Sequence, residues 1–414
     1  MKLAETLLES TSSNRLAGIY TNVGHTLTHI VTILYATAVL HLPQVFGLPY
    51  GEMLGLASVG LVLYGVAALP AGWLGDRWSQ VGMMVVLFAG IGGALLIVGT
   101  ANSTTQLFIG LSLLGLFAAI YHPVGIAWLV ASARKQGMSL GINGLFGGLG
   151  SAIAAPFVGL MIDHLSWRAA FIVPAVISIA VGAMLLVAWR RGSVCDVKQD
   201  HTTQRPAGAG AMKRAFIVLS LTMTCSGFIY AALTNTMPKL FEGGLGIDLA
   251  VNYTEIGLYV GGVIGFASIS SIAGGWLADR YSPKSIYILF WLLQIIPLYF
   301  VTSMFGTGLI ALMAVVLLVN TGFTAAENML VARYTPLEWR GIAYGAKFVL
   351  ALGIGGLTVE LAGLLFDAKG NFDLLYMLLS AAALVALFGA LMLPGKGSPA
   401  PVSRLQNDPQ TGPV

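Results

Sequence analysis

The chain of 414 residues is 57% hydrophobic and only 9% charged, whereas a soluble domain carries roughly 25% charged residues. This composition excludes a protein whose whole surface faces water, and it indicates an integral membrane protein. The formal charge of +4 does not indicate a nucleic-acid partner, because the basic residues lie between apolar segments and form no patch. The apolar segments are continuous over about 20 residues, which also excludes the alternating strands of a membrane β-barrel.

These segments predict an all-α protein with twelve transmembrane helices in two six-helix bundles. The predicted spans are 17–42, 52–73, 81–100, 105–130, 139–162 and 168–189 in the first bundle, and 214–237, 254–277, 284–304, 307–332, 341–364 and 372–393 in the second. The predicted domains are an N-terminal bundle (1–189), a polar and basic linker (190–213), a C-terminal bundle (214–394) and a polar tail (395–414).

The distribution of Lys and Arg predicts the orientation of the chain. Nearly all of them fall at the termini, in the linker, or in loops on the same side of the membrane, whereas Arg168, Lys239 and Lys369 fall on the opposite side. The positive-inside rule then places both termini, the linker and the tail in the cytoplasm. We expect a multi-pass protein of the inner or plasma membrane.

One segment, Gly72-Trp73-Leu74-Gly75-Asp76-Arg77, returns about 200 residues later as Gly275-Trp276-Leu277-Ala278-Asp279-Arg280. Each copy closes an apolar span, so the repeat indicates a duplicated bundle. The two parallel repeats joined by a linker resemble the major facilitator transporters. That resemblance implies a cytoplasmic gate at Gly72, Asp76, Arg77, Gly275, Asp279 and Arg280. In such a gate Asp76 would face the start of helix 11 and Asp279 the start of helix 5, where the helix dipole favours a carboxylate. The alternative is an ordinary charged turn.

Two histidines lie in the first predicted span. His25 and His29 are four residues apart and therefore share one helical face, and they lie roughly 12 and 18 Å from the start of the span. Ionisable groups at this depth normally face a cavity or a partner, and histidine can change its charge near neutral pH. The alternative is a pair of neutral histidines bonded to hydroxyls such as those of Thr28 or Thr32.

Helix 4 contains Tyr121-His122-Pro123, in which the proline opens the backbone ladder. A histidine in helix 1 and an aromatic-His-Pro in helix 4 resemble the fosmidomycin-resistance branch of the major facilitator superfamily, a branch of drug-proton antiporters. In that branch helix 1 reads His-x-x-Asn-Asp and helix 4 reads Phe-His-Pro-Glu. Here Thr28, His29 and Val124 replace the Asn, the Asp and the Glu. We hypothesise that His29 carries protons in place of the missing acid.

Helix 5 contains Ser151, Ala155, Pro156 and Gly159 in a pattern that resembles the antiporter-associated Gly-x-x-x-Gly-Pro-x-x-Gly-Gly. Small residues with a proline permit close packing and a bend that could seal one side of the membrane. The pattern favours export. The alternative is helix packing without a directional meaning.

In the second half, Glu327 falls by the repeat offset beside the position of His122, and it is a candidate for reversible protonation in the same cavity. Lys347 could pair with Glu327 or extend to the cytoplasmic interface, and the sequence slightly favours the interface. Glu360, near the outer end of helix 11, is expected at the interface.

The sequence therefore predicts a secondary transporter that exports a small organic compound in exchange for protons by alternating access. The candidate substrate and proton path is His25, His29, Tyr121, His122, Asn143, Glu327 and Lys347. We expect no enzyme activity, no cofactor and no resident metal, and a monomer would suffice. The alternative hypothesis is a carrier of transition-metal ions in which His25, His29 and His122 supply the ligands.

Overall fold

The computed structural model describes residues 2–133, 136–197, 209–247, 252–335 and 345–394, and every regular element in these ranges is helical. The N-terminal half contains α1 (Lys2–Ala38), α2 (Leu42–Phe46), α3 (Tyr50–Gly55), α4 (Ser58–Val66), α5 (Ala68–Arg77), α6 (Gln80–Gly99), α7 (Thr104–Ala118), η1 (Tyr121–Gly125), α8 (Ile126–Ser132), α9 (Gln136–His164) and α10 (Ala169–Arg190). The C-terminal half contains α11 (Ala209–Leu245), α12 (Tyr253–Ser268), α13 (Ser270–Arg280), α14 (Pro283–Phe300), η2 (Val301–Ser303), α15 (Gly306–Gly322), α16 (Thr324–Tyr334), η3 (Val349–Gly353), α18 (Ile354–Lys369) and α19 (Asp373–Leu391).

Among the described residues, ten helices are long and apolar enough to cross a membrane, and the bent pair Tyr50–Val66 and Ala68–Arg77 can add an eleventh. The helix α1 is not in this set, because its His, Thr and Asn side chains lower its hydropathy. An all-helical, multi-pass membrane protein is therefore confirmed, and the count of twelve spans stays a prediction. Residues 209–213, which we assigned to the linker, are instead the first turn of α11. The tail, 395–414, lies outside the described residues.

Prolines explain two interruptions within predicted spans. The span 52–73 is divided into α3, α4 and α5, and its axis bends by 40° beside Ala67. Pro70 lies in the first turn of α5. It has no backbone N–H, so it cannot donate a hydrogen bond to a carbonyl of the preceding turn. In helix 4, Pro123 was predicted to interrupt the backbone hydrogen bonds of the helix. The structure has a π-helical turn there, Tyr121–Gly125.

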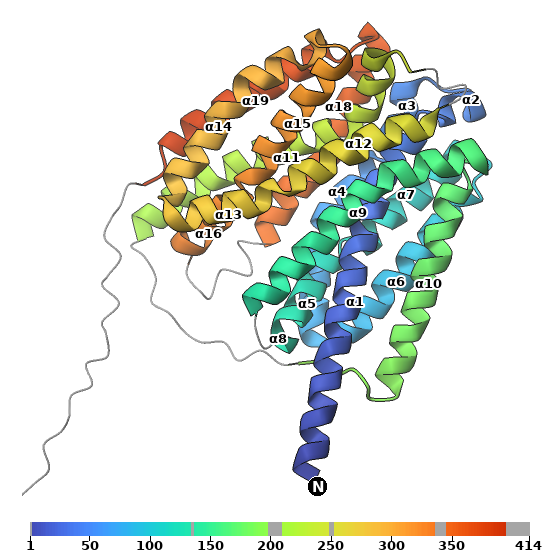
Figure 1. Ribbon diagram of the computed structural model, residues 1–414, viewed down its shortest axis with the longest axis vertical. Coiled ribbons are helices and arrows are strands. Elements are labelled where there is room, and N and C mark those ends of the chain that lie inside the picture. The colour runs from blue at the N-terminus through green and yellow to red at the C-terminus, as the bar shows by residue number, and fades with distance from the viewer. Residues whose placement is uncertain (1, 134–135, 198–208, 248–251, 336–344, 395–414) are drawn as a thin grey trace, which may run out of the picture.

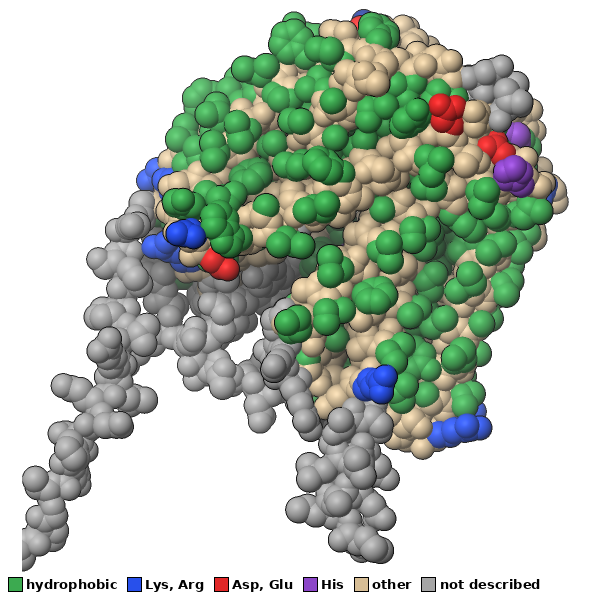
Figure 2. Space-filling model, in the orientation of Figure 1, with side chains coloured by type: hydrophobic (Ala, Val, Ile, Leu, Met, Phe, Trp, Pro, Cys, Tyr) green, Lys and Arg blue, Asp and Glu red, His purple; other side chains and the backbone are tan. Residues whose placement is uncertain are grey.

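The two halves lie side by side and meet most closely at one end of the molecule (Figure 1). This closed end contains the α1–α3 connection, the last turn of α9, the start of α12 and the last turn of α18. At the opposite end, where α10 stops and α11 starts, α5 and α8 pack within the N-terminal half. There α13 and α16 likewise pack within the C-terminal half. Figure 2 shows a hollow between the halves towards this linker end. With the predicted orientation, the closed end faces the outside and the linker end faces the cytoplasm.

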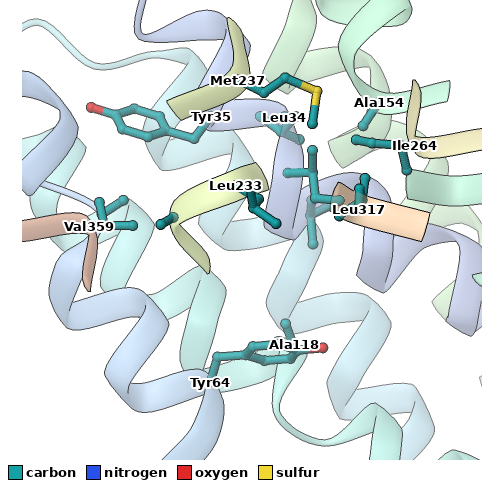
Figure 3. Close-up of a cluster of buried hydrophobic side chains, with 14 of the residues drawn as sticks. Leu34, Tyr35, Tyr64, Ala118, Ala154, Leu233, Met237, Ile264, Leu317 and Val359 are labelled. Carbon is teal, nitrogen blue, oxygen red and sulfur yellow. The ribbon is translucent and has the colours of Figure 1, made fainter. Parts of the chain in front are cut away.

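The apolar core is continuous across the two halves near the closed end. Figure 3 shows Leu34 of α1 beside Met237 of α11 and Ile264 of α12, with Ala154 of α9 and Leu317 of α15 close by. All of these side chains are buried. Association of the halves at this end therefore removes apolar surface from both.

Glycines bring the backbones of the two halves into contact. A Cβ on Gly261 of α12 would overlap the carbonyl oxygen of Ala152 in α9, and one on Gly257 would overlap that of Ala155. Across the second seam, Gly356 of α18 faces the carbonyl of Ser58. Small residues allow such close packing in membranes. Of the small residues predicted to matter in helix 5, Ala155, Pro156 and Gly159 thus lie at the seam between the halves.

Substitution of Gly261 by valine is expected to open the closed end, because the added methyl groups would push α12 away from the α9 backbone. Overpacking of this kind costs about 1–3 kcal/mol. The matched control is Gly262→Val, since a Cβ at Gly262 meets no atom within 4 Å. The measurement is alkylation of a cysteine introduced by Thr254→Cys in a variant without Cys195 and Cys225. Faster alkylation with Gly261→Val than with Gly262→Val is expected, and equal rates would contradict the close approach.

Candidate substrate and proton site

The three membrane histidines form one cluster. The ring centroids of His25 and His29 are 4.8 Å apart, and the His122 ring lies 5.5 Å from the first and 5.7 Å from the second. Tyr121 stacks on His25 at 4.7 Å. The fourfold spacing on α1 and the π-helical turn of helix 4 therefore bring the predicted residues together. One ring nitrogen from each histidine lies within 4.8 Å of the others.

Asn143 of α9 organises this cluster. The His25 Nδ1–H donates to the Asn143 carbonyl at 2.7 Å, and the Tyr121 hydroxyl donates to Asn143 Oδ1 at 2.9 Å. The Asn143 amide donates to Asn22 Oδ1 at 2.9 Å. Gly147, one turn further along α9, leaves the space that the His25 ring occupies. His25, Tyr121 and Asn143 are thus one hydrogen-bonded unit, and His29 and His122 join it through ring contacts.

The partners of the histidines differ from the hydroxyls that we considered. His29 Nδ1 bonds to Ser151 Oγ at 3.0 Å, whereas the Thr32 hydroxyl donates to the carbonyls of Thr28 and His29 within its own helix. Helical threonines commonly satisfy their hydroxyls in this way. In the described structure His122 Nδ1 is buried without a hydrogen-bond partner, which leaves one nitrogen of the cluster free for a ligand or a proton.

Lys347 pairs with Glu327, so the expectation that it extends to the interface was wrong. The Lys347 ammonium lies 2.7 Å from Glu327 Oε1 and donates to Asn328 Oδ1 at 2.6 Å. The Tyr287 hydroxyl donates to the second carboxylate oxygen at 2.8 Å. The side chains of Lys347 and Glu327 are 12% and 4% exposed. A buried carboxylate attracts this lysine more strongly than a distant interface does, because the charge of the acid would otherwise be unpaired.

Lys347 and Asn143 occupy equivalent positions in the two repeats, since the repeat offset relates them. Each is the centre of the polar cluster in its own half. The cluster of the N-terminal half is built of neutral hydrogen bonds and imidazoles, whereas that of the C-terminal half contains an ion pair. The duplicated fold therefore places two chemically different polar centres at matching depth.

The two clusters meet through an aromatic stack. The His122 ring lies on the Phe348 ring at 5.1 Å with an interplanar angle of 17°, and Phe348 follows Lys347 in the chain. We expected Glu327 itself to share the cavity with His122, but the described contact across the halves is made by Phe348. The sequence signal that could have indicated it is an aromatic residue directly after Lys347, the only lysine in the interior of a predicted span.

The predicted cytoplasmic gate is described only on the side of its repeated segments. Asp76, Arg77, Asp279 and Arg280 are exposed, and neither acid makes an ion pair with a described residue. Each arginine instead lies over a tryptophan of its own repeat: Arg77 over Trp73 at 4.8 Å and Arg280 over Trp276 at 5.4 Å. The partners expected for the acids fall partly on 134–135 and 336–344, outside the described residues. Gly72 allows α5 to approach Pro123, whereas Gly275 faces open space.

A second, unpredicted pair of gates closes the opposite end. Asp163, in the last turn of α9, accepts hydrogen bonds from the backbone N–H groups of Tyr253 and Thr254 at 3.1 and 2.7 Å, and from the Thr254 hydroxyl at 2.6 Å. The carboxylate of one half thus caps the first turn of α12 in the other, where the helix dipole favours it.

Asp367 forms the corresponding cap from the C-terminal half to a helix of the N-terminal half. From the last turn of α18 it accepts from the N–H groups of Gly51 and Glu52 at 2.7 and 3.0 Å. Beside it, Glu360 accepts from the Ser58 hydroxyl at 2.8 Å, so its assignment to the interface was incomplete. The repeat offset relates Asp163 to Asp367, and this symmetry is the sequence signal that could have revealed both caps.

A neutral histidine joins the seam beside Asp163. The Gln44 amide donates to His41 Nδ1 at 2.8 Å and to the Tyr253 hydroxyl at 3.0 Å, and that hydroxyl lies 3.1 Å from His41 Nδ1. Nδ1 must therefore be unprotonated. Burial lowers the pKa of His41, which favours this form.

The helical bundle, the two polar centres and the caps across the closed end are typical of a membrane transporter, and the sequence comparisons identify its family. Residues 22–346 match the Major Facilitator Superfamily. The chain belongs to this superfamily, whose members move solutes by rocking two related bundles about a central site.

Relatives in this superfamily are distant and differ in what they carry. The chain is 24% identical to the 4-hydroxybenzoate transporter PcaK of Pseudomonas putida, with 83% of each chain covered. It is 24% identical to the nitrite extrusion protein of Bacillus subtilis (86% of this chain and 89% of the relative). It is 26% identical to the multidrug resistance protein MdtG of Escherichia fergusonii (81% of each). The names of these relatives do not place the chain in the fosmidomycin-resistance branch.

Solved structures show the same fold. An inward-facing, occupied bacterial homologue of the human lysosomal transporter Spinster aligns with a TM-score of 0.69 at 14% identity, covering 92% of this chain and 94% of that one. The transporter FucP in its outward conformation aligns with a TM-score of 0.62 at 14% identity, covering 92% and 100%.

Proposed function

We propose that the protein is a proton-coupled secondary transporter of a small organic compound. The observation that carries this proposal is the Glu327–Lys347 pair, which is buried within the membrane. A carboxylate at that depth is costly unless it serves transport or is paired. The Glu327 carboxylate can be neutralised either by the Lys347 ammonium beside it or by binding a proton. The neighbouring stack of His122 on Phe348 gives a route by which a change at this pair would alter the contact between the halves.

Protons could move in the direction opposite to the compound or in the same direction. Export in exchange for protons is favoured by the helix 5 pattern and by the resistance function in the name of MdtG. In the structure, however, Ala155 and Pro156 pack against α12 at the closed end, a role that suits a seal in either direction. Co-transport of an anion with a proton is favoured by Lys347, because a second anion can bind there only when Glu327 is neutral.

A metal carrier is not favoured. The three imidazoles do converge, but no acid or thiol belongs to the group, and the relatives named above carry organic acids, nitrite or drugs. We expect the protein to work as a monomer in the inner membrane with both termini in the cytoplasm.

The test uses proteoliposomes that contain the purified protein and a pH-sensitive dye. Small organic acids, sugars and drug cations are added outside in turn, and the internal pH is followed. At least one compound is expected to move protons with the wild type and not with Glu327→Gln, while Glu52→Gln, which changes an exposed carboxylate, keeps the response. The sign of the pH change distinguishes exchange from co-transport. Compound uptake by the wild type without proton movement would refute the coupling.

A further inference from the structure

A narrow pocket opens beside Lys347 in the C-terminal half. Its walls are one face of α11, which contributes Phe216, Leu219 and Met223, together with Tyr334 of α16 and Leu350 of η3. These residues of α11 follow one another at intervals of three to four positions, as expected for one side of a helix. The pocket lies towards the linker end, where the halves are parted. Most of its lining is apolar, and its volume is about 30 Å³, so the flexible Phe216, Met223 and Leu350 side chains must move apart to admit the hydrocarbon part of a small molecule.

The polar groups of the pocket select the charge of its occupant. Among the described residues that line it, Lys347 is the only charged side chain, and Ser220 adds a hydroxyl. A lysine ammonium has three N–H donors and no acceptor. In the part of the chain that the structure describes, two of these donors are used, on Glu327 and Asn328, and the third is available to a group that accepts hydrogen bonds. A cationic compound would meet repulsion from this ammonium, and no carboxylate is among the described residues that line the pocket.

We propose that this pocket binds a small organic anion with an apolar body, and that its carboxylate or similar group replaces Glu327 as the partner of Lys347. This inference rests on the proposed function and assigns the substrate class to it. With Glu327 ionised, a bound anion would leave two negative charges on one buried ammonium. Binding therefore requires that Glu327 takes up a proton, and each anion bound is linked to one proton bound.

The groups around Glu327 allow this exchange. Tyr287 of α14 and Lys347 are the titratable side chains that contact it. The helices α11, α13 and α15 also pack against α14 or α16. Of their charged residues, Lys213 and Arg214 of α11 and Asp279 and Arg280 of α13 are exposed at the linker end, and Lys239 and Glu242 of α11 pair with each other at the closed end. Lys284 of α14 is bound to the carbonyls of Leu391 and Leu393.

The experiment measures binding of radiolabelled benzoate and hexanoate to the purified full-length protein in detergent, with unlabelled benzylamine and benzamide as cationic and neutral competitors. Both anions are expected to bind, and neither competitor should displace them. Lys347→Gln should weaken binding about tenfold or more, and Lys347→Arg should restore most of it. Glu327→Gln should tighten binding at neutral pH, because the competing carboxylate is gone.

Two further variants keep the result interpretable. Lys347→Gln alone leaves Glu327 unpaired and could unfold the protein. The double variant Lys347→Gln with Glu327→Gln therefore serves as the folded variant without the cation. It should not bind benzoate or hexanoate. Ser220→Leu fills the pocket while leaving the ion pair intact, and it should also abolish binding. The matched control is Lys239→Gln, since Lys239 pairs with Glu242 at the closed end.

Displacement by benzylamine or benzamide, or unchanged binding in the folded variant without the cation, would overturn the inference. Failure of the two proposals is distinguishable. If benzoate binds through Lys347 but no compound moves protons in liposomes, the coupling fails and the pocket stands. If benzoate does not bind while a sugar or drug cation moves protons, the assigned substrate class fails and the coupling stands.

Discussion

Asparagine in place of Asp163 and Asp367 is expected to open the closed end of the transporter. Each carboxylate accepts two backbone N–H groups from the other half, and hydrogen bonds to a charged group contribute roughly 1.5–3 kcal/mol each. The amide is isosteric but uncharged, so we expect each substitution to cost the closed arrangement about 1–3 kcal/mol. The two sites are on separate helix pairs, and their effects should add.

The measurement is the distance between spin labels on cysteines introduced by Val45→Cys and Gly243→Cys, which are exposed positions on the two halves near the closed end. The double variant Asp163→Asn with Asp367→Asn should shift the distribution to longer distances, and each single variant should shift it less. Asp373→Asn is the control, because Asp373 is an exposed acid in the first turn of α19. An unchanged distribution in the double variant would show that the caps do not hold this end.

These two caps show what sequence patterns conceal. The repeat relates Asp163 to Asp367 as clearly as it relates Asp76 to Asp279. Acidic residues are common at the ends of membrane spans, however. The neighbouring sequence does not distinguish a carboxylate that caps a helix of the other half from one that faces water. Its partner is set by how two bundles dock, which is a long-range property. The segment 72–77 could be recognised because its glycine, tryptophan, acid and arginine recur in order at 275–280, yet in this structure its acids are exposed.

The histidine cluster was easier to predict, because its geometry is local. A spacing of four residues fixes one face of α1, and a proline fixes the distortion of helix 4. The hydrogen-bond partners of these rings come from α9, more than 100 residues away, and sequence reasoning therefore chose neighbouring threonines instead. The twofold organisation of the fold could be predicted from one repeated segment, whereas the bend in the second span required the position of Pro70 relative to a helix start.

Methionine in place of Lys347 is expected to destabilise the protein by about 3–5 kcal/mol, because the change leaves the buried Glu327 carboxylate without its cation. Glu327→Gln should also destabilise, since it leaves the ammonium unpaired. The double variant Lys347→Met with Glu327→Gln should recover most of the loss, because neither charge then remains in the membrane. Such recovery is the signature of a pair that contacts directly.

The free energy of unfolding is measured in mixed detergent micelles for the wild type, both single variants and the double variant. Lys239→Met serves as the comparison: its ammonium pairs with Glu242 three residues away, and the two side chains are 23% and 22% exposed. Water partly screens this pair, so its loss should cost less than loss of the Glu327–Lys347 pair. If the losses of the two single variants simply add in the double variant, Lys347 and Glu327 do not interact in the folded protein. Recovery of stability together with loss of proton movement would separate the two roles of the pair, because a neutral substitute can fill the membrane interior but cannot exchange a carboxylate for a proton.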